Sequence, residues 1–230
     1  MPRLVVASVL ALGISACGLI SSDVTETSFD LPPRTYSFDA STFNAPAGIA
    51  SEVPCGVAPV VDCCNPTPPL PAPDCSATPL TCEQNENGMM VCTATVSVSQ
   101  GSTINLGQEV PQLSGFTGIV NIKIKRIGYT VTTNTLNVDL PDVVLYLAAQ
   151  GVTDPADASA RKFGTLPAIP AGTTVVGDVV LEPDAGNVFN SFAQNLATPF
   201  NFIAATTLRV THSPTGKIDM TISGKLAASL

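Results

Sequence analysis

Residues 116–131, FTGIVNIKIKRIGYTV, contain the alternation of apolar and polar side chains that is typical of a β-strand with one buried face. As far as Ile124 the apolar or small side chains hold the even positions, whereas from Ile127 to Val131 they hold the odd positions. Successive side chains of a strand point to opposite faces, so one extra residue is needed to keep both sets buried. The pattern therefore predicts a β-bulge at Lys125-Arg126.

The sequence on either side of this stretch repeats the strand pattern. Residues 96–106 alternate around Gln100-Gly101-Ser102, which predicts a hairpin. The apolar positions change parity across Pro141, which predicts an irregularity there, and a further strand is expected at 173–181. The last two strands are expected to form a hairpin around the turn SPTG at 213–216.

Two short helices are expected among these strands. Asp154-Pro155 is a favourable N-cap and first position for a helix that extends to about Lys162. A second helix is expected after Asp184, because aromatic and leucine side chains recur there at helical spacing and can pack on the sheet. These residues are Phe189, Phe192 and Leu196.

Residues 54–92 hold six cysteines and eight prolines but few large apolar side chains, so covalent bridges are needed to order them. The spacing leaves all 15 pairings of six half-cystines open, including an unusual bridge between the adjacent Cys63 and Cys64. A zinc site is the alternative, but the segment has no C-x-x-C pair and the single histidine, His212, lies far away. We expect three disulfides among Cys55, Cys63, Cys64, Cys75, Cys82 and Cys92.

The N-terminus has the layout of an export signal. Arg3 supplies one positive charge, residues 4–13 are apolar or small, and the first acid is Asp23. The apolar run is interrupted before Ile20, whereas a membrane-spanning helix needs about 20 apolar residues. Residues 14–17, Ile-Ser-Ala-Cys, resemble the lipobox of bacterial lipoproteins.

The lipobox resemblance implies cleavage before Cys17 and modification of its thiol with acyl chains such as palmitate. Gly18 stands where an acid would retain such proteins in the inner membrane of enteric-type bacteria, so the resemblance implies the outer membrane of a Gram-negative cell envelope. The alternative is an ordinary secretory signal in which Cys17 is one more small residue. Lipidation of Cys17 leaves six cysteines, an even number suited to disulfides.

A second resemblance concerns the C-terminal half, about residues 117–226. It is similar to the water-stress and hypersensitive-response β-sandwich of late-embryogenesis-abundant proteins. The similar segments are 127–131 (IGYTV), 134–136 (NTL), 145–147 (LYL) and 169–173 (IPAGT). The sequence departs from that family at Asn134-Thr135, where the family usually has Asn-Pro. The resemblance implies a β-sandwich and no catalytic residues.

The composition agrees with a mainly β fold, because 20 prolines and 17 glycines favour short strands and turns over long helices. We expect a mainly β, immunoglobulin-like antiparallel β-sandwich with one or two short helices, preceded by a disulfide-rich irregular segment. The expected divisions are a lipoprotein signal peptide at 1–16, a lipidated tether with a possible edge strand at 17–53, a Cys/Pro-rich disulfide segment at 54–92 and the β-sandwich domain at 93–230.

Charge is unevenly distributed along the chain. Residues 18–116 contain ten acids and one base, Arg34, whereas residues 117–230 contain eight of each, so the acidic half follows Cys17 directly. Nucleic-acid binding needs a basic stripe that neutralises phosphates. The nearest candidate, Lys123-Lys125-Arg126, is a small cluster that we interpret as the solvated face of one strand.

The sequence contains no recognisable catalytic constellation. It lacks a nucleophile elbow, a phosphate-binding loop and a two-histidine zinc helix. His212 is expected at the end of a strand without an acidic partner, and the pairs Asp154/Asp157 and Glu182/Asp184 are interpreted as helix caps. We therefore expect no enzymatic activity, no cofactor and no metal ion.

Two classes of function remain. The first is a non-catalytic structural or binding module, held to the membrane by the lipid anchor on Cys17, that contacts another envelope protein or a polymer. The alternative is a carrier of lipid or another small hydrophobic ligand. A carrier would need an apolar cavity of several hundred Å³, roughly the size of other small-molecule sites.

We predict that the mature protein begins at lipidated Cys17 and partitions into detergent. Replacing the thiol in Cys17→Ser removes the site of lipid attachment and should release the protein from the membrane. N-terminal mass analysis and membrane fractionation measure both outcomes. A native N-terminus upstream of Cys17, or a Cys17→Ser protein that stays membrane-bound, would refute the lipoprotein interpretation.

Overall fold

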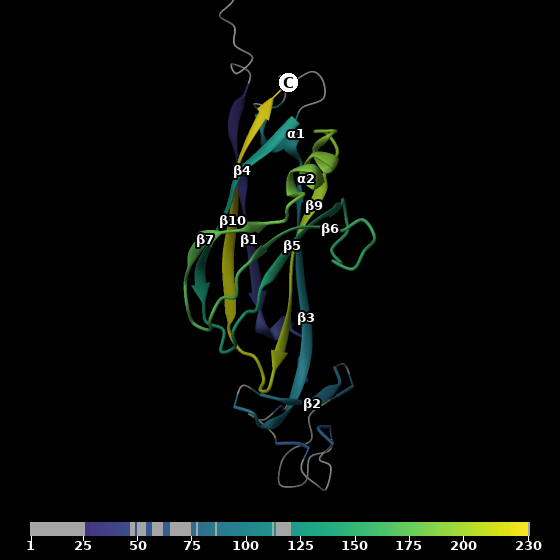
Figure 1. Ribbon diagram of the computed structural model, residues 1–230, viewed down its shortest axis with the longest axis vertical. Coiled ribbons are helices and arrows are strands. Elements are labelled where there is room, and N and C mark those ends of the chain that lie inside the picture. Colours follow the sequence, from purple (N-terminus) through teal and green to yellow (C-terminus); the bar gives the residue numbers. More distant parts are fainter. Residues whose placement is uncertain are drawn as a thin grey trace, which may run out of the picture.

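The computed structural model describes residues 26–46, 49, 54–56, 62–64, 75–76, 78–85, 87–111, 113 and 121–229. These residues form two antiparallel sheets that pack face to face, with two short α-helices at one end (Figure 1). The expectation of a mainly β antiparallel sandwich with short helices is therefore confirmed. None of the described helices is long and apolar enough to cross a bilayer.

The four-stranded sheet, called sheet A here, and the six-stranded sheet B draw their strands from all along the described chain. Sheet A has the order β1 (Thr27–Asp39), β10 (Lys217–Ser229), β4 (Asn121–Asn134) and β7 (Val176–Asp178). Sheet B has the order β2 (Leu80–Gln84), β3 (Met90–Ile104), β9 (Phe200–Val210), β5 (Val143–Ala149), β6 (Arg161–Leu166) and β8 (Val180–Leu181). The helices are η2 (Ala40–Thr42), α1 (Leu106–Glu109) and α2 (Ala185–Ala193).

The space between the sheets is filled by apolar side chains from alternate strand positions. Its largest members include Tyr36 of β1, Phe163 of β6 and Phe189 of α2, each at most 1% exposed. The ring of Phe202 lies 5.6 Å from that of Phe163 and 6.4 Å from that of Tyr36, centroid to centroid. The Tyr36 hydroxyl donates to the Phe202 carbonyl, and burial raises the pKa of this phenol above its usual value.

The predicted bulge in β4 is confirmed. Ile124 lies opposite Leu226 of β10, and Arg126 lies opposite Lys225, so Lys125 is the extra residue. The shift keeps both Ile122 and Ile127 buried, as the change of parity requires. Residues 116–120, with which the alternating stretch begins, lie outside the described residues.

The predicted hairpin at Gln100-Gly101-Ser102 is wrong. Strand β3 runs straight through these residues and pairs with β9 from Ala94 to Ile104. The glycine serves a close approach rather than a turn, because a Cβ on Gly101 would lie 3.1 Å from Cγ2 of Thr153 in the loop after β5.

The predicted hairpin around residues 213–216 is also wrong, since β9 belongs to sheet B and β10 to sheet A. The SPTG turn carries the chain from one sheet to the other. Turn residues in the sequence signal a reversal of direction, but they do not reveal whether the second strand pairs with the first. Other connections cross in the same way: the chain passes between the sheets around Pro141, for example, and again at Val179, between β7 and β8.

The first predicted helix, Asp154 to Lys162, is replaced by two turns followed by β6. The Asp154 carboxylate accepts a hydrogen bond from the backbone of Ala156, and the Asp157 carboxylate accepts from Ser159. These local bonds favour turns over helix, which explains the failure. The second predicted helix is confirmed as α2, which buries Phe189 and half-buries Phe192.

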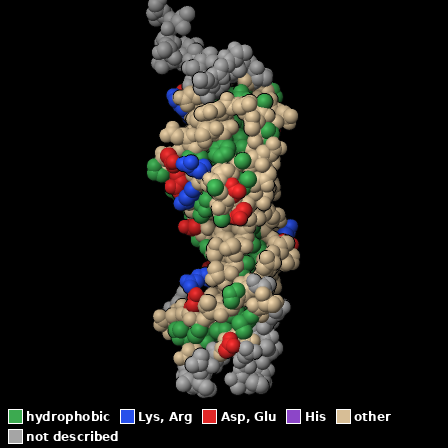
Figure 2. Space-filling model, turned by 90° about the vertical axis from the view of Figure 1, so that its right-hand side faces the viewer, with side chains coloured by type: hydrophobic (Ala, Val, Ile, Leu, Met, Phe, Trp, Pro, Cys, Tyr) green, Lys and Arg blue, Asp and Glu red, His purple; other side chains and the backbone are tan. Residues whose placement is uncertain are grey.

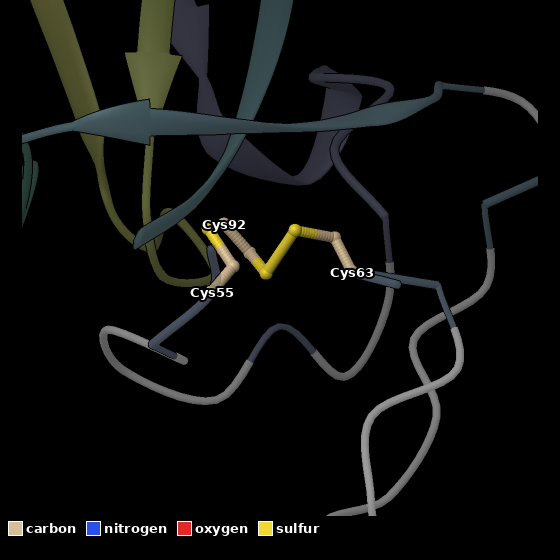
Figure 3. A group of neighbouring side chains, drawn as sticks. All are labelled: Cys55, Cys63 and Cys92. Carbon is tan, nitrogen blue, oxygen red and sulfur yellow. A yellow bond between two sulfur atoms is a disulfide. The ribbon is translucent and has the colours of Figure 1, made fainter. Parts of the chain in front are cut away.

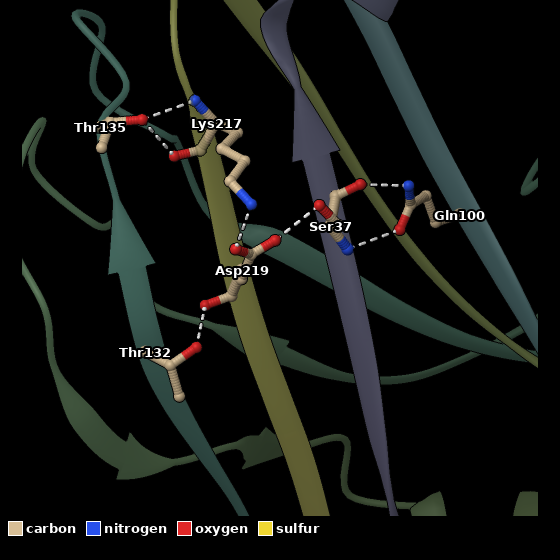
Figure 4. Close-up of polar contacts among 6 residues, drawn as sticks. All are labelled: Ser37, Gln100, Thr132, Thr135, Lys217 and Asp219. Atoms are coloured by element: carbon tan, nitrogen blue, oxygen red, sulfur yellow. Dashed lines mark hydrogen bonds and ion pairs between the residues drawn. The ribbon is translucent and has the colours of Figure 1, made fainter.

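The sandwich depends on a strand that precedes the cysteines. Strand β1 pairs with β10 at the edge of sheet A, as the possible edge strand around Tyr36 predicts. The amide side chain of Gln100, from sheet B, accepts a hydrogen bond from the Ser37 backbone N–H at 2.9 Å and donates one to the Ser37 carbonyl (Figure 4). A fragment that begins near Thr117 would therefore lack β1 and β3, both of which complete the sheets.

We predict that Gly216→Ala strongly destabilises the protein. Gly216 has φ +86°, and a Cβ there would collide with the backbone carbonyl of Thr135. Thr135 is hydrogen-bonded to the backbone of Lys217 (Figure 4). The collision would therefore break these hydrogen bonds where the chain enters β10 from the turn between the sheets. We expect a loss of more than about 3 kcal/mol, measured by urea unfolding.

Gly172→Ala is the matched control for Gly216→Ala. Gly172 has φ +67°, but no atom lies within 4 Å of its added Cβ. This variant should cost only about 1–2 kcal/mol of left-handed backbone strain. Equal losses for the two variants would show that contact with Thr135 does not matter.

Candidate functional site

Cys17 and the lipobox lie outside the described residues, so lipidation stays a prediction. The other six predicted site residues, the half-cystines, are all described. They form three disulfides, Cys55–Cys82, Cys63–Cys92 and Cys64–Cys75. All three bridges lie before Thr93, as expected, and the adjacent Cys63 and Cys64 have different partners.

Two of the disulfides meet beneath the β2–β3 hairpin. Cys82 of β2 and Cys92 of β3 are cross-strand partners, but each bonds to a separate segment outside the hairpin. The Sγ atoms of Cys55, Cys63 and Cys92 lie within 4.8 Å of one another (Figure 3). Because these sulfurs are oxidised in disulfides, they offer no thiolate to a zinc ion.

The outer face of sheet B carries a long trough, made of two adjoining grooves and lined by both polar and apolar side chains. The upper groove, about 730 Å³, has β3, β9 and β5 as its floor and the loop after β5 as one wall. The lower groove, about 660 Å³, extends to the β2–β3 hairpin. Pro141 and Thr207 line both grooves, so an extended occupant could lie across the two.

Small hydroxyl side chains form much of the trough floor. The Ser97 and Thr207 hydroxyls, on paired strands, lie 3.2 Å apart, and the Ser99 hydroxyl donates to the Thr153 carbonyl at 3.2 Å. Tyr146, the aromatic residue of the upper groove, adds a half-buried ring. The trough therefore offers hydrogen-bonding groups over a shallow, open surface. On the face of the molecule drawn in Figure 2, charged side chains cover only a small part of the surface.

The charges that line the trough are mainly negative. Arg209 forms an ion pair with Glu83, which leaves Asp139, Asp142 and Asp154 as uncompensated carboxylates. Asp139 and Asp142 each accept one backbone N–H from the loop after β6, and Asp154 accepts one from Ala156 in its own turn. The trough therefore carries a local excess of negative charge.

His212 lies just beyond the end of β9, as predicted, and lines the lower groove. It forms no hydrogen bond or ion pair with any described residue. Asp154, Asp157 and Glu182 are likewise engaged structurally, the first two in turns and Glu182 in an ion pair with Lys162. None of these side chains forms a nucleophile–base pair of the kind that hydrolytic catalysis needs.

A small apolar cavity lies between the sheets near Arg34. Its walls include Ile127, Phe202 and Ile222, and its volume of about 20 Å³ suits a single water molecule. The ion pair of Arg34 with Glu109 lies at its side. This cavity is far smaller than a lipid or hydrophobic metabolite requires. Neither this cavity nor the trough is predicted by any pattern in the sequence.

Comparisons with known proteins do not identify a family. No protein-family model matches the chain, and no curated protein matches it in sequence. The similar solved structures include a chain of turnip yellow mosaic virus (15% identity, TM-score 0.25, 60% of this chain and 80% of that chain) and one of Desmodium yellow mottle tymovirus (11%, 0.25, 70% and 92%). A chain of the empty head of turnip yellow mosaic virus is 13% identical, with a TM-score of 0.25 over 100% of this chain and 90% of that chain. At such TM-scores these matches carry no argument about fold or function.

We predict that the three disulfides are reduced in a definite order. Cys63 and Cys92 are 6% and 1% exposed, whereas Cys64 and Cys75 are half-buried. A reductant must reach a sulfur atom, so Cys64–Cys75 and Cys55–Cys82, whose Cys82 is exposed, should both open before Cys63–Cys92. Differential alkylation followed by mass spectrometry measures the order.

Before any reductant is added, the unfolded protein should contain no free thiol among these six cysteines. Cys63 and Cys64 are neighbours in sequence, so they act as matched controls for local accessibility. Early labelling of Cys63, or two or more free thiols at the start, would contradict the pairing.

Proposed function

We propose that this chain is a non-catalytic binding module of a bacterial cell envelope, anchored to the outer membrane by lipid on Cys17. The feature that carries the proposal is the trough on the outer face of sheet B. It is open, lined by both hydroxyl and apolar side chains and long enough for an extended occupant, and no described helix covers it. The expected partner is another envelope protein or a neutral or cationic polymer.

The interior favours this function over the alternative, a carrier of lipid or another hydrophobic ligand. The buried aromatic and aliphatic side chains pack against one another between the sheets, and the cavity near Arg34 has room for about one water molecule.

The charge of the trough also argues for the class of partner. Three uncompensated aspartates, Asp139, Asp142 and Asp154, disfavour a polyanion and leave nucleic acid an unsuitable ligand.

The proposal can be tested in cells with a photo-crosslinking residue placed at Thr207, which is exposed at the junction of the two grooves. The matched control is the same residue at Thr132, an exposed threonine on β4 in the opposite sheet. We expect a discrete crosslinked species from position 207 and none from position 132. Crosslinks of equal yield at both positions, or none at either, would overturn the assignment of the trough.

A second substitution tests whether the trough itself is the contact surface. Ser97 lies directly opposite Thr207 across the strand pair, so Ser97→Arg fills the floor with a large cation while leaving the sheet backbone intact. This change should abolish the crosslink from position 207. It should leave the free energy of unfolding within about 0.5 kcal/mol of that of the parent protein. If stoichiometric lipid were extracted from the purified protein, the carrier function would replace this proposal.

A further inference from the structure

The fold adds Lys225 to the short basic cluster of the sequence, Lys123-Lys125-Arg126. Lys225 of β10 lies directly opposite Arg126 of β4, and Lys123 lies two pairs further along the same two strands. All three side chains are exposed on the outer face of sheet A, beside Lys125 at the bulge. Like charges on directly paired positions repel each other, so this end of the sheet favours an external anion.

The carboxylates nearby neutralise this cluster only in part. Lys125 forms an ion pair with Glu26 at 2.5 Å, and Arg126 forms one with Asp178 at 2.5 Å. The Lys125 hydrogen bond, with the charges of Lys125 and Lys123, holds the pKa of Glu26 below its usual value. Lys123 and Lys225 form no ion pair with any described residue, although Asp30 lies opposite Lys225 on β1.

The cluster lies at the end of the sandwich where the N-terminal segment enters. Thr27 opens β1 and pairs with Ala228, three residues from Lys225, so these cations lie at the same end as the start of β1 (Figure 1). Only nine residues, 18–26, separate Cys17 from Thr27, with Asp23 and Glu26 as the acids between them. That segment reaches at most about 35 Å when fully extended.

We propose that the cationic end of sheet A, formed by Lys123, Lys125, Arg126 and Lys225, rests on the anionic lipid headgroups of the membrane that holds the anchor. The inference depends on the proposed lipid anchor at Cys17, because the anchor keeps this end close to the bilayer. Each cation near an anionic surface strengthens contact about fivefold, and the effect falls off within a Debye length of about 8 Å. The sequence alone placed an acidic half beside the anchor, and the fold brings these cations to the same end.

Lysine labelling of the lipidated full-length protein in vesicles tests this contact. The protein is reconstituted in phosphatidylcholine vesicles with or without phosphatidylglycerol, treated with an amine-reactive reagent and mapped by mass spectrometry. Lys225 and Lys123 should be labelled about fivefold more slowly on the anionic vesicles, and the difference should disappear at high salt.

Lys217 is the internal control. It lies on the same strand as Lys225 but about 26 Å away, eight residues at roughly 3.3 Å each, and beyond the reach of the surface charge. Its labelling should be equal on both kinds of vesicle. A combined Lys123→Gln and Lys225→Gln variant should abolish the difference at Lys125, whereas Lys162→Gln, on sheet B, should preserve it.

The outcomes separate this inference from the anchor on which it depends. Protein that stays on the vesicles with equal labelling of Lys225 on both lipids would overturn the headgroup contact and leave the lipid anchor standing. Protein that dissociates from both kinds of vesicle would overturn the anchor itself. Slower labelling of Lys217 together with Lys225 would also refute the contact, because it would indicate general shielding.

Discussion

The sandwich depends on how the open edges of its four-stranded sheet are satisfied. At one edge the Gln100 amide forms hydrogen bonds with both backbone groups of Ser37. Near the other edge the Asn190 amide of α2 does the same for Ile122, with both donor–acceptor distances at 2.8 Å. Each side-chain amide thus replaces one residue of a missing strand and joins sheet A to the layer opposite. Without them these edges would present unpaired groups to other chains.

The features that the sequence predicted well are those fixed by local physics. The change of parity around Lys125 located a bulge, because a strand has no other way to keep Ile122 and Ile127 on one face. Helical spacing around Phe189 located α2, and cysteine density identified the disulfide segment. Each of these patterns is complete within a short stretch of chain, so no knowledge of distant partners was needed.

The features that were missed are set by partners far away in the sequence. Gly101 looked like a turn residue, but it admits the loop that contains Thr153, which lies 52 residues later. The SPTG turn looked like a hairpin because alternation cannot tell which sheet receives the next strand. The trough was invisible for the same reason, since β3, β9 and β5 become neighbours only through long-range pairing. The disulfide pairing was also missed, because the sequence does not reveal which of the 15 possible pairings brings the cysteines close together.

The register of the β2–β3 hairpin affects how the protein must mature. Cys82 and Cys92 face each other across the strand pair. Opposite residues of antiparallel strands have Cα atoms about 4.5–5.5 Å apart, which is within the range of a disulfide. A hairpin that forms early therefore brings together two thiols that the native protein keeps apart. Oxidation at that moment traps a non-native bridge, which only thiol–disulfide exchange can resolve. We therefore expect a slow exchange step in the oxidative folding of this chain.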